Sequence, residues 1–329
     1  MRKKPGPKAP PAAQKKAVTL EEFRDQEQAI LSEIVTFCNN LTLSLYADTT
    51  VVKTPEAVFR GQVLSRNRWV SEEYLLNYRR SHSDMGALIG VNNYRLPMAV
   101  AALMHRDREE DDSQLIALPP YQNLREPLSG VVRSRRSVRQ YSGRPLTLVQ
   151  VSTLLFHAAG VTGRLEVDVP AGAEALLDDP HVELRATASG GGLYPVDLFL
   201  LATNVTGLAS GAYRYLPRQH ALVAATRPLL PVPPVGDLGQ FGEMEAEKAG
   251  MLLGYVYSTS ENQRKYGDTG LAFALMETGA IAAHIHLACT ALGLGSCDVG
   301  SFVKERLERL FDADGMSRHL LHLTVIGNR

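Results

Sequence analysis

Apolar and polar positions follow clear periods through the second half of the chain. Thr147 and Gln150 form a capping box, apolar residues then recur at helical spacing, and Gly160 is a typical stop, so the pattern predicts a helix between these signals. Apolar, β-branched runs at 196–205 and 250–258 predict strands. This part of the chain therefore contains both helices and strands.

The remaining periodic segments complete an α+β pattern. Two short apolar runs, 212–216 and 221–224, flank a polar turn and predict a hairpin. Residues 271–292 are hydrophobic on nearly all sides, which predicts a helix buried in the core or at a subunit interface. A short helix is expected over 303–311 and a last strand over 320–326. Because helices and strands do not alternate regularly, we expect α+β and not a doubly wound sheet.

The first part of the chain has a different character. Thr19 and Glu22 form a capping box, so ordered structure is expected to begin there. The charge cluster at 106–112 and the prolines at 119 and 120 resist burial and regular structure, which predicts a domain junction. We therefore expect a disordered basic tail (1–18), a helical or mixed N-terminal domain that docks a peptide or partner (19–115), and a catalytic domain (116–329).

Composition narrows the class of protein. The 329 residues are 45% hydrophobic, which is enough for a sizeable core, and 35 basic residues balance 35 acidic ones. No whole-chain field attracts nucleic acid or an anionic membrane. Cys38, Cys289 and Cys297 form no CxxC pair, and no apolar run is expected to reach membrane-spanning length. We expect a cytoplasmic protein without disulfides and without nucleic-acid or membrane partners.

The densest chemical signal is the stretch Ser134-Arg-Arg-Ser-Val-Arg-Gln-Tyr141. Guanidinium groups of Arg135, Arg136 and Arg139 match phosphate oxygens, and the hydroxyl of Ser137 is a compact additional donor. On composition alone a solvated basic loop is the favoured interpretation, because charge runs usually lie on the surface.

A second signal is Ser189-Gly190-Gly191-Gly192-Leu-Tyr194-Pro195. Three glycines let the backbone approach a flat ligand, although a tight turn explains them equally well. The stretch precedes a strand instead of opening a helix after one, which excludes a dinucleotide fingerprint.

The third and fourth signals flank the long apolar helix. Lys265 and Tyr266 both titrate near ten when unperturbed, and burial could make either a useful proton carrier; taken alone they are a surface dipeptide. Small residues at 293–302 leave backbone N–H groups free at a helix entrance. His284 and His286 lack a ligand partner at helical spacing, so we expect core or interface histidines and no metal site.

These four stretches, in this order, resemble the nitroreductase superfamily from about Ile116 to Arg329. The closest likeness is to its SagB-type branch, the azoline dehydrogenases of thiazole/oxazole-modified peptide pathways. The resemblance implies a nitroreductase-like α+β fold, with a central mixed sheet flanked by helices, and FMN at the interface of a homodimer.

The resemblance also implies roles for residues. Arg135 and Arg136 serve the FMN phosphate, and Ser137 and Arg139 reach the phosphate or the ring edge. The isoalloxazine is lined by the loop that contains Ser189, Gly190, Gly191, Gly192 and Tyr194, and by the backbone of Gly300 and Ser301. Arg329 meets the phosphate, as a late arginine does in some relatives.

In this branch the Lys-Tyr pair is required for activity, which implies that Lys265 or Tyr266 removes a proton while hydride passes to the flavin. The implied partners are a precursor peptide and a cyclodehydratase. The chain departs from many relatives at Thr269, Leu271, Ala272 and Ala280, so the resemblance implies flavin binding but not the detail of the substrate. Alternatives are a cyclic dipeptide oxidase, an NAD(P)H nitroreductase, or a non-catalytic scaffold subunit.

Overall fold

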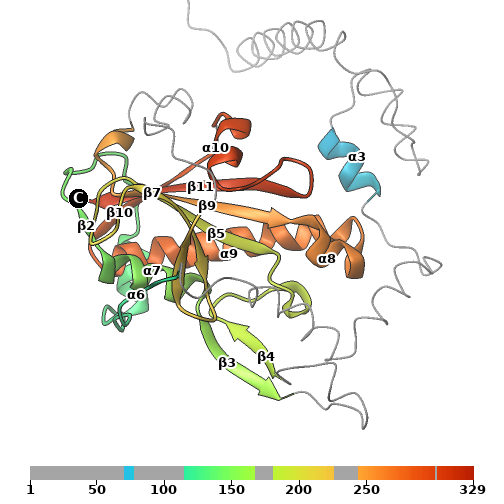
Figure 1. Cartoon of the computed structure of the whole chain (residues 1–329), viewed down its shortest axis with the longest axis horizontal. Helices are drawn as coiled ribbons and strands as arrows, with labels where there is room; N and C mark the ends of the chain where they lie inside the picture. Colours follow the sequence, from blue (N-terminus) through green and yellow to red (C-terminus); the bar gives the residue numbers. More distant parts are fainter. Residues whose placement is uncertain (1–69, 78–114, 167–180, 226–243, 301) are drawn as a thin grey trace, which may run out of the picture. The chain divides into compact units, whose positions relative to one another are not determined.

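The computed structural model describes residues 70–77, 115–166, 181–225, 244–300 and 302–329 (Figure 1). The chain divides into two units, Met1–Ser81 and His82–Arg329, and each is described by itself. The described part of the first unit is helix α3 (Val70–Asn77). The expectations for the tail, the capping box at Thr19, the charge cluster at 106–112 and Cys38 lie outside the described residues, and the domain boundaries stay predictions.

Seven strands form the central sheet of the second unit: β1 (Leu115–Ala117), β5 (Val196–Ala202), β7 (Gly211–Leu216), β8 (Ala221–Ala224), β9 (Met251–Ser258), β10 (Leu294–Val299) and β11 (Arg318–Asn328). Their order is β1-β8-β7-β5-β9-β11-β10, and neighbouring strands are antiparallel. A parallel bridge joins Ser137 to Ser296 in β10, so the sheet carries both kinds of pairing. Two small pairs lie outside it: β2 (Leu146–Thr147) with β6 (Val205–Thr206), and β3 (Val161–Glu166) with β4 (His181–Arg185).

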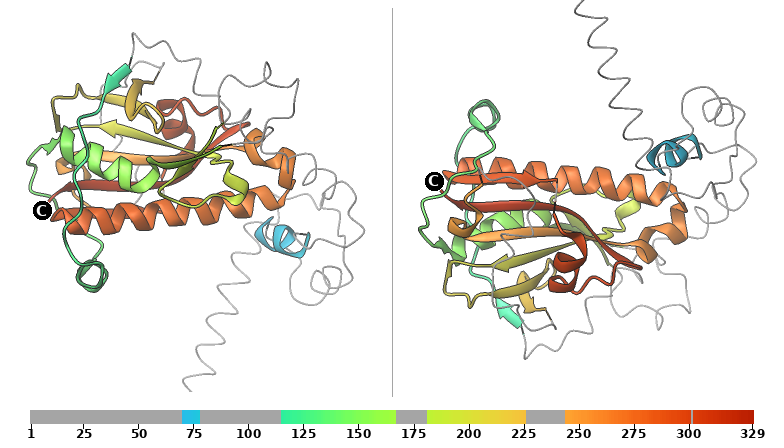
Figure 2. Two further views of the ribbon diagram at one scale, coloured as in Figure 1. Left: turned by 90° about the horizontal axis from the view of Figure 1, so that it is seen from below. Right: turned by 90° about the horizontal axis from the view of Figure 1, so that it is seen from above.

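Helices cover both faces of this sheet (Figure 2). Because side chains alternate along a strand, Leu198 and Leu200 of β5 belong to one core while Phe199 and Leu201 belong to the other. Helices α7 (Leu148–Ala159) and α9 (Thr269–Ala291) supply the first core, and α10 (Lys304–Leu310) supplies the second. The predicted α+β class is confirmed.

Helix α7 begins and ends where its sequence signals lie. The side chain of Thr147 accepts a hydrogen bond from the Gln150 backbone N–H, and the Gln150 side chain accepts one from the backbone N–H of Thr147. Gly160 is the C-terminal cap. The hairpin of β7 and β8 and the strands β5, β9 and β11 are confirmed in the same way.

Helix α9 is long and apolar enough to cross a membrane by length and composition alone, contrary to the expectation that no run reaches that length. In the fold it packs against α7, β10 and β11, and about half of its residues are buried. Its apolar character is thus explained by its place in the core. Leu275 and Met276 of this helix are 51% and 61% exposed.

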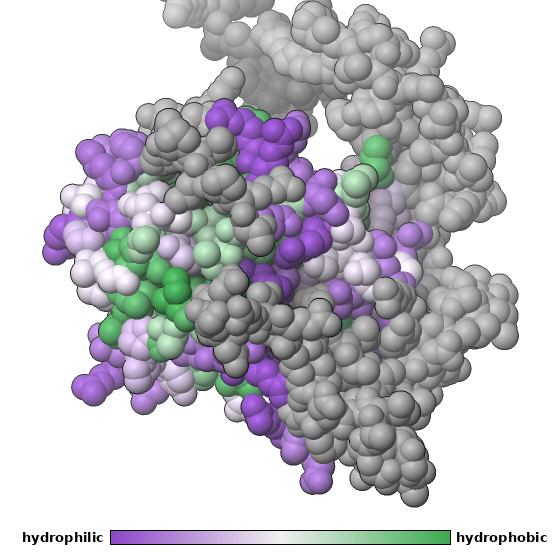
Figure 3. Space-filling view, in the orientation of Figure 1, coloured by the Kyte–Doolittle hydropathy of each residue, from purple (hydrophilic) through white to green (hydrophobic). Residues whose placement is uncertain are grey.

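Exposed apolar side chains also occur on α6 (Leu128–Ser134), which packs against α9. Leu128 and Val132 of this helix are exposed. Figure 3 shows a hydrophobic area on the side of the view where α6 and α7 lie in Figure 1, with hydrophilic residues around it. Contiguous apolar surface of this kind is typical of an interaction face.

Two elements differ from the sequence-based expectation. Lys265 and Tyr266, which taken alone were a surface dipeptide, end a helix that was not predicted, α8 (Thr259–Tyr266), and Lys265 is buried. The segment at 293–302 is not a helix entrance, because β10 occupies most of it and pairs with β11. Its side chains therefore alternate between two faces of the sheet, and this alternation decides which of them reach the site.

Candidate functional site

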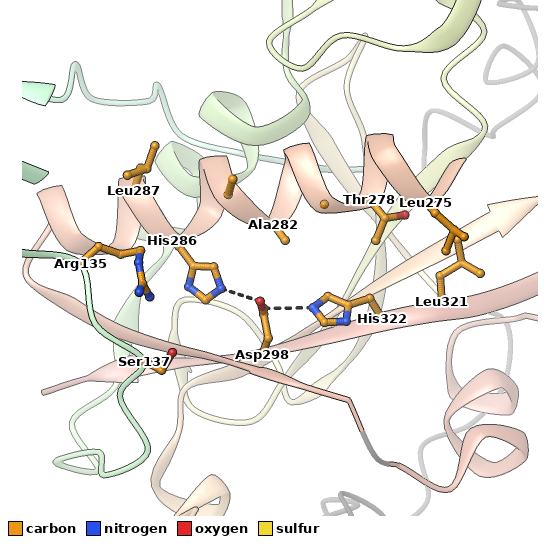
Figure 4. A pocket seen from close by; sticks show the side chains of 12 residues that line it. Arg135, Ser137, Leu275, Thr278, Ala282, His286, Leu287, Asp298, Leu321 and His322 are labelled. Carbon is orange, nitrogen blue, oxygen red and sulfur yellow. Dashed lines mark ion pairs between the residues drawn. The ribbon is translucent and has the colours of Figure 1, made fainter. Parts of the chain in front are cut away.

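A cavity of about 610 Å³ lies between α9, β10, β11 and the loop that follows α6 (Figure 4). The strands and the loop contribute mostly polar side chains, and α9 contributes mostly small or apolar ones together with His286. The lining residues the site uses are Arg135, Ser137, Leu275, His286, Asp298 and His322.

The loop after α6 places two predicted phosphate ligands in this cavity. The bridge from Ser137 to Ser296 and the bond from the Val138 N–H to the Ser296 carbonyl, 2.9 Å, attach the loop to β10. Arg135 and Ser137 both line the cavity, and the guanidinium of Arg135 has no partner among the described residues. The loop thus offers a cation and a hydroxyl to a ligand.

The other two arginines of this motif lie elsewhere. The guanidinium of Arg136 donates to the carbonyls of Arg133 and Arg135, at 2.9 and 2.8 Å, so it fixes its own loop. Burial raises the pKa of the Cys297 thiol, and the charge of Arg139 opposes that rise. Arg139 is not among the residues that line the cavity, and its backbone carbonyl accepts from the Glu245 N–H at 2.9 Å.

Two histidines bind one carboxylate in the cavity wall. The Nε2 atom of His286 lies 2.9 Å from Oδ2 of Asp298, and the Nε2 atom of His322 lies 3.1 Å from Oδ1 (Figure 4). The hydroxyl of Thr324 donates to Oδ1 at 2.7 Å. Burial opposes ionisation, but these three hydrogen bonds outweigh it and hold the pKa of the Asp298 carboxyl well below its ordinary value.

The glycine loop forms a second region, next to the end of α8. Gly191 and Gly192 both have positive φ, 68° and 67°, a conformation that glycine adopts without strain. A Cβ at Gly191 would collide with the Tyr266 hydroxyl and would lie 2.7 Å from Nζ of Lys265. The loop therefore approaches the Lys-Tyr pair so closely that any side chain at 191 would displace the ends of Lys265 and Tyr266.

Neighbouring side chains hold this pair. Lys265 is buried and Tyr266 is half-buried. The Tyr266 ring meets the Phe273 ring edge to face, with centroids 4.8 Å apart, and Nζ of Lys265 lies 5.2 Å from the Tyr266 ring centre. Gly190 also packs on Phe273. The structure thus joins two motifs that the sequence keeps far apart.

Glu277 of α9 lies beneath the same loop. Its Oε1 accepts from the Val196 N–H at 3.4 Å, and its Oε2 has no partner among the described residues. Burial raises the pKa of this carboxyl to about 7, while a hydrogen bond from Ser189 and the charge of Arg185 oppose the rise. Ser189 in turn accepts from the Tyr194 N–H at 2.9 Å, so Glu277 and the loop support each other.

The remaining predicted residues that the structure describes lie outside the cavity lining. The hydroxyl of Tyr194 accepts from the Arg185 N–H at 3.0 Å, which ties Tyr194 to β4. Gly300 follows β10, and Ser301 lies outside the described residues. The carbonyl of Arg329 accepts from Arg144 at 3.0 Å.

Sequence reasoning missed the carboxylate cluster. His286 was expected to be a core histidine, and Asp298 and His322 were not singled out. No local signal in the sequence could have found it, because the cluster depends on the register that pairs Asp298 with Thr324. In the described part of the chain, no group of three His, Cys, Asp or Glu side chains is arranged to hold a metal ion.

Comparisons with known proteins agree with this fold. A nitroreductase-family protein of Methanocaldococcus jannaschii is 29% identical over 202 residues, which are 60% of this chain and 90% of that protein. A nitroreductase-type crystal structure from Ralstonia eutropha, at 24% identity, has a TM-score of 0.50 and covers 67% of this chain and 91% of its own.

A structure of the E. coli microcin synthetase McbBCD complex with truncated pro-MccB17 is also similar, at 19% identity and a TM-score of 0.44, over 80% of this chain and 99% of that chain. A likeness of this size says nothing about activity. The model of the nitroreductase family matches residues 132–327, which is more than half of the chain. The chain therefore belongs to the nitroreductase family.

Proposed function

We propose that this chain is an FMN-dependent dehydrogenase that oxidises azoline rings of a ribosomally made peptide to azoles. The nitroreductase family generally uses FMN. The observation that carries the finer proposal is the contact of Lys265 and Tyr266 with Gly191. Two adjacent side chains that can carry protons are held against a segment without side chains, where a flat ring can approach them.

The cavity fits FMN in size and in donor chemistry. Its volume of about 610 Å³ lies within the range of roughly 300–1,000 Å³ that is common for small-molecule sites. Arg135 and Ser137 suit a phosphate, and Leu275 and Leu321 at the other end suit an apolar ring (Figure 4). We assign the phosphate to Arg135 and Ser137. Roles for Arg136, Arg139, Gly300, Ser301 and Arg329 at the cofactor stay predictions.

When bound, FMN supplies the acceptor for a hydride. Lys265 or Tyr266 removes the proton from the ring carbon that was the amino-acid α-carbon, while the adjacent CH₂ group gives up the hydride. Phe273 orients Tyr266, and the glycine loop keeps other side chains away from both groups. Proton transfer by a positioned group typically contributes on the order of 10²–10⁴ in rate.

The proposed assembly is a homodimer that acts with a cyclodehydratase on a precursor peptide. The exposed apolar side chains Leu275 and Met276 on α9, and Leu128 and Val132 on α6, support a second copy as one partner. The cyclodehydratase and the peptide follow from the resemblance of the four motifs to azoline dehydrogenases.

The proposal is tested with purified protein and a peptide already cyclised to azolines. We expect yellow protein that releases FMN and not FAD on denaturation, and a peptide that loses two hydrogens per ring, measured by mass spectrometry. Protein that cannot be loaded with FMN would contradict the cofactor assignment. Protein that ignores azolines but reduces a nitroarene with NAD(P)H is instead a reductase.

A further inference from the structure

His286, Asp298 and His322 have no part in the proton removal proposed for Lys265 and Tyr266. They line the same cavity as Arg135, although they come from three different elements, α9, β10 and β11. Two imidazoles reach one partly buried carboxylate only because the fold brings these three elements together. Ionisable groups gathered in a ligand cavity are candidates for a role in the chemistry.

The hydrogen bonds fix how these imidazoles carry protons. Because Asp298 is ionised and accepts from both rings, each Nε2 carries a hydrogen. The Nδ1 atom of His286 lies 2.7 Å from the Ser296 hydroxyl, which can donate to a neutral ring or accept from a charged one. The Nδ1 atom of His322 has no partner among the described residues. Both rings can therefore gain a proton without losing a bond to Asp298.

The net charge of this cluster depends on how many protons the two imidazoles hold. Among the described lining residues, Arg135 on the loop is the other ionisable group. Tyr255 of β9 lies behind His322, with ring centres 5.4 Å apart, and burial raises the pKa of Tyr255, so it stays neutral. With both imidazoles neutral the cluster carries one negative charge, and each proton bound adds one positive charge. Imidazole is the side chain that titrates between about pH 5 and 8.

We propose that His286, Asp298 and His322 form a proton-exchanging site in the cavity wall, which rests on the proposed function because it serves the flavin bound there. The site binds one proton from solvent when a hydride is delivered to that flavin, and it gives the proton up when the flavin is reoxidised. Asp298 is the positioning residue, since it orients both rings and stabilises the charged form.

The step is balanced in charge and atoms. A hydride adds two electrons and one hydrogen nucleus, so it leaves one negative charge in the cavity, and the proton bound by an imidazole offsets that charge. On reoxidation, dioxygen receives the two electrons, the hydrogen that came as hydride and the proton from the site, and leaves as hydrogen peroxide. The cluster then returns to its starting state.

The test counts protons on the FMN-loaded protein. The flavin is reduced photochemically in weakly buffered solution, and an indicator dye reports the protons bound per flavin between about pH 6 and 8. We expect His322→Gln and Asp298→Asn to bind fewer protons than the parent, by up to about one per flavin. The pH dependence of the midpoint potential should become shallower in the same variants. His319→Gln, on the same strand but outside the cavity, should match the parent.

The possible results of this test overturn different proposals. Equal proton counts in the parent and in both variants would overturn the proton-exchanging site while leaving FMN binding and azoline oxidation intact. A parent that binds FMN but ignores azolines overturns the proposed substrate and leaves the proton count to decide this inference. A parent that binds no FMN overturns both proposals together.

Discussion

The two regions of the site each hold one acidic side chain, and their pKa values shift in opposite directions. Asp298, in the cavity wall, accepts hydrogen bonds from two imidazoles and a hydroxyl, which hold its pKa well below the ordinary value. Glu277, under the glycine loop, is buried with one oxygen unpaired among the described residues, and burial raises its pKa to about 7. Desolvation acts on both but is greater for the buried Glu277 than for the more exposed Asp298, whose hydrogen-bond donors outweigh it.

The opposite pKa shifts suit the two carboxyl groups to different roles. A carboxylate that stays ionised is a fixed charge, and it can organise cations around a ligand. A carboxyl that titrates near neutral pH exchanges protons with small changes in its surroundings. The cavity region is thus built around a carboxylate that stays ionised and holds two imidazoles, whereas the loop region is built around a carboxyl that itself titrates near neutral pH. The predictions below test this contrast.

The largest effect is expected from the Lys-Tyr pair of the loop region. Lys265→Ala and Tyr266→Phe should slow azoline oxidation by about 10²–10⁴, because positioned proton transfer is lost. FMN content should be unchanged, since the residues that we assign to the phosphate, Arg135 and Ser137, lie in the other region. Lys248→Ala and Tyr213→Phe are matched controls, with an exposed lysine and a tyrosine bonded to a backbone carbonyl. Variants as fast as the parent would remove the pair from the mechanism.

A methyl group in the glycine loop should displace the same pair. Gly191→Ala and Gly192→Ala both place alanine at positive φ, which costs about 1–2 kcal/mol in each. Only the alanine at 191 would meet Lys265 and Tyr266, whose flexible ends can move aside. We therefore expect similar stability but azoline oxidation slower by about 10² in Gly191→Ala, because small misplacements of reacting groups are costly. Equal rates in the two variants would show that the contact is not functional.

The buried carboxyl of the loop region should be visible in the pH dependence of stability. The unfolded chain releases the Glu277 proton near 4.5 and the folded protein near 7, so the free energy of unfolding falls as pH rises between these values. The loss is about 3 kcal/mol and remains constant above this window. Glu277→Gln should remove the fall, as measured by urea unfolding at several pH values, whereas Glu245→Gln, an exposed control, should keep it.

Local signals in the sequence were enough to predict some elements. The capping box determines where α7 begins, and the polar turn determines where the β7–β8 hairpin reverses. Each signal lies within a few residues of the element that it determines. Helix α8 was missed because its polar sequence has no apolar period, and β10 was missed because Gly295, Ser296 and Asp298 are poor strand formers. Pairing with β11 and cover by α9 override that propensity.

The two regions of the site also differ in how far the sequence predicts them. Lys265, Tyr266 and the glycine loop are short motifs that a resemblance identifies one by one, although their contact becomes visible only in the fold. The carboxylate cluster has no motif, because it depends on the register that pairs Asp298 with Thr324. Which side chains share a cavity wall is a property of register and helix rotation, and the sequence alone fixes neither.

The smallest expected effect is a difference in FMN affinity between variants of two neighbouring arginines, Arg135 and Arg136. The guanidinium of Arg135 has no partner among the described residues and lines the cavity, whereas that of Arg136 is bonded to the carbonyls of Arg133 and Arg135. Arg135→Ala should weaken FMN binding by about 1.5–3 kcal/mol, the usual value of a charge-assisted contact, and added FMN should restore occupancy. Arg136→Ala should bind FMN like the parent but unfold at lower urea. FMN titrations with both variants decide between them: equal losses would mean that both arginines reach the phosphate, and no loss in either would place the phosphate outside this cavity.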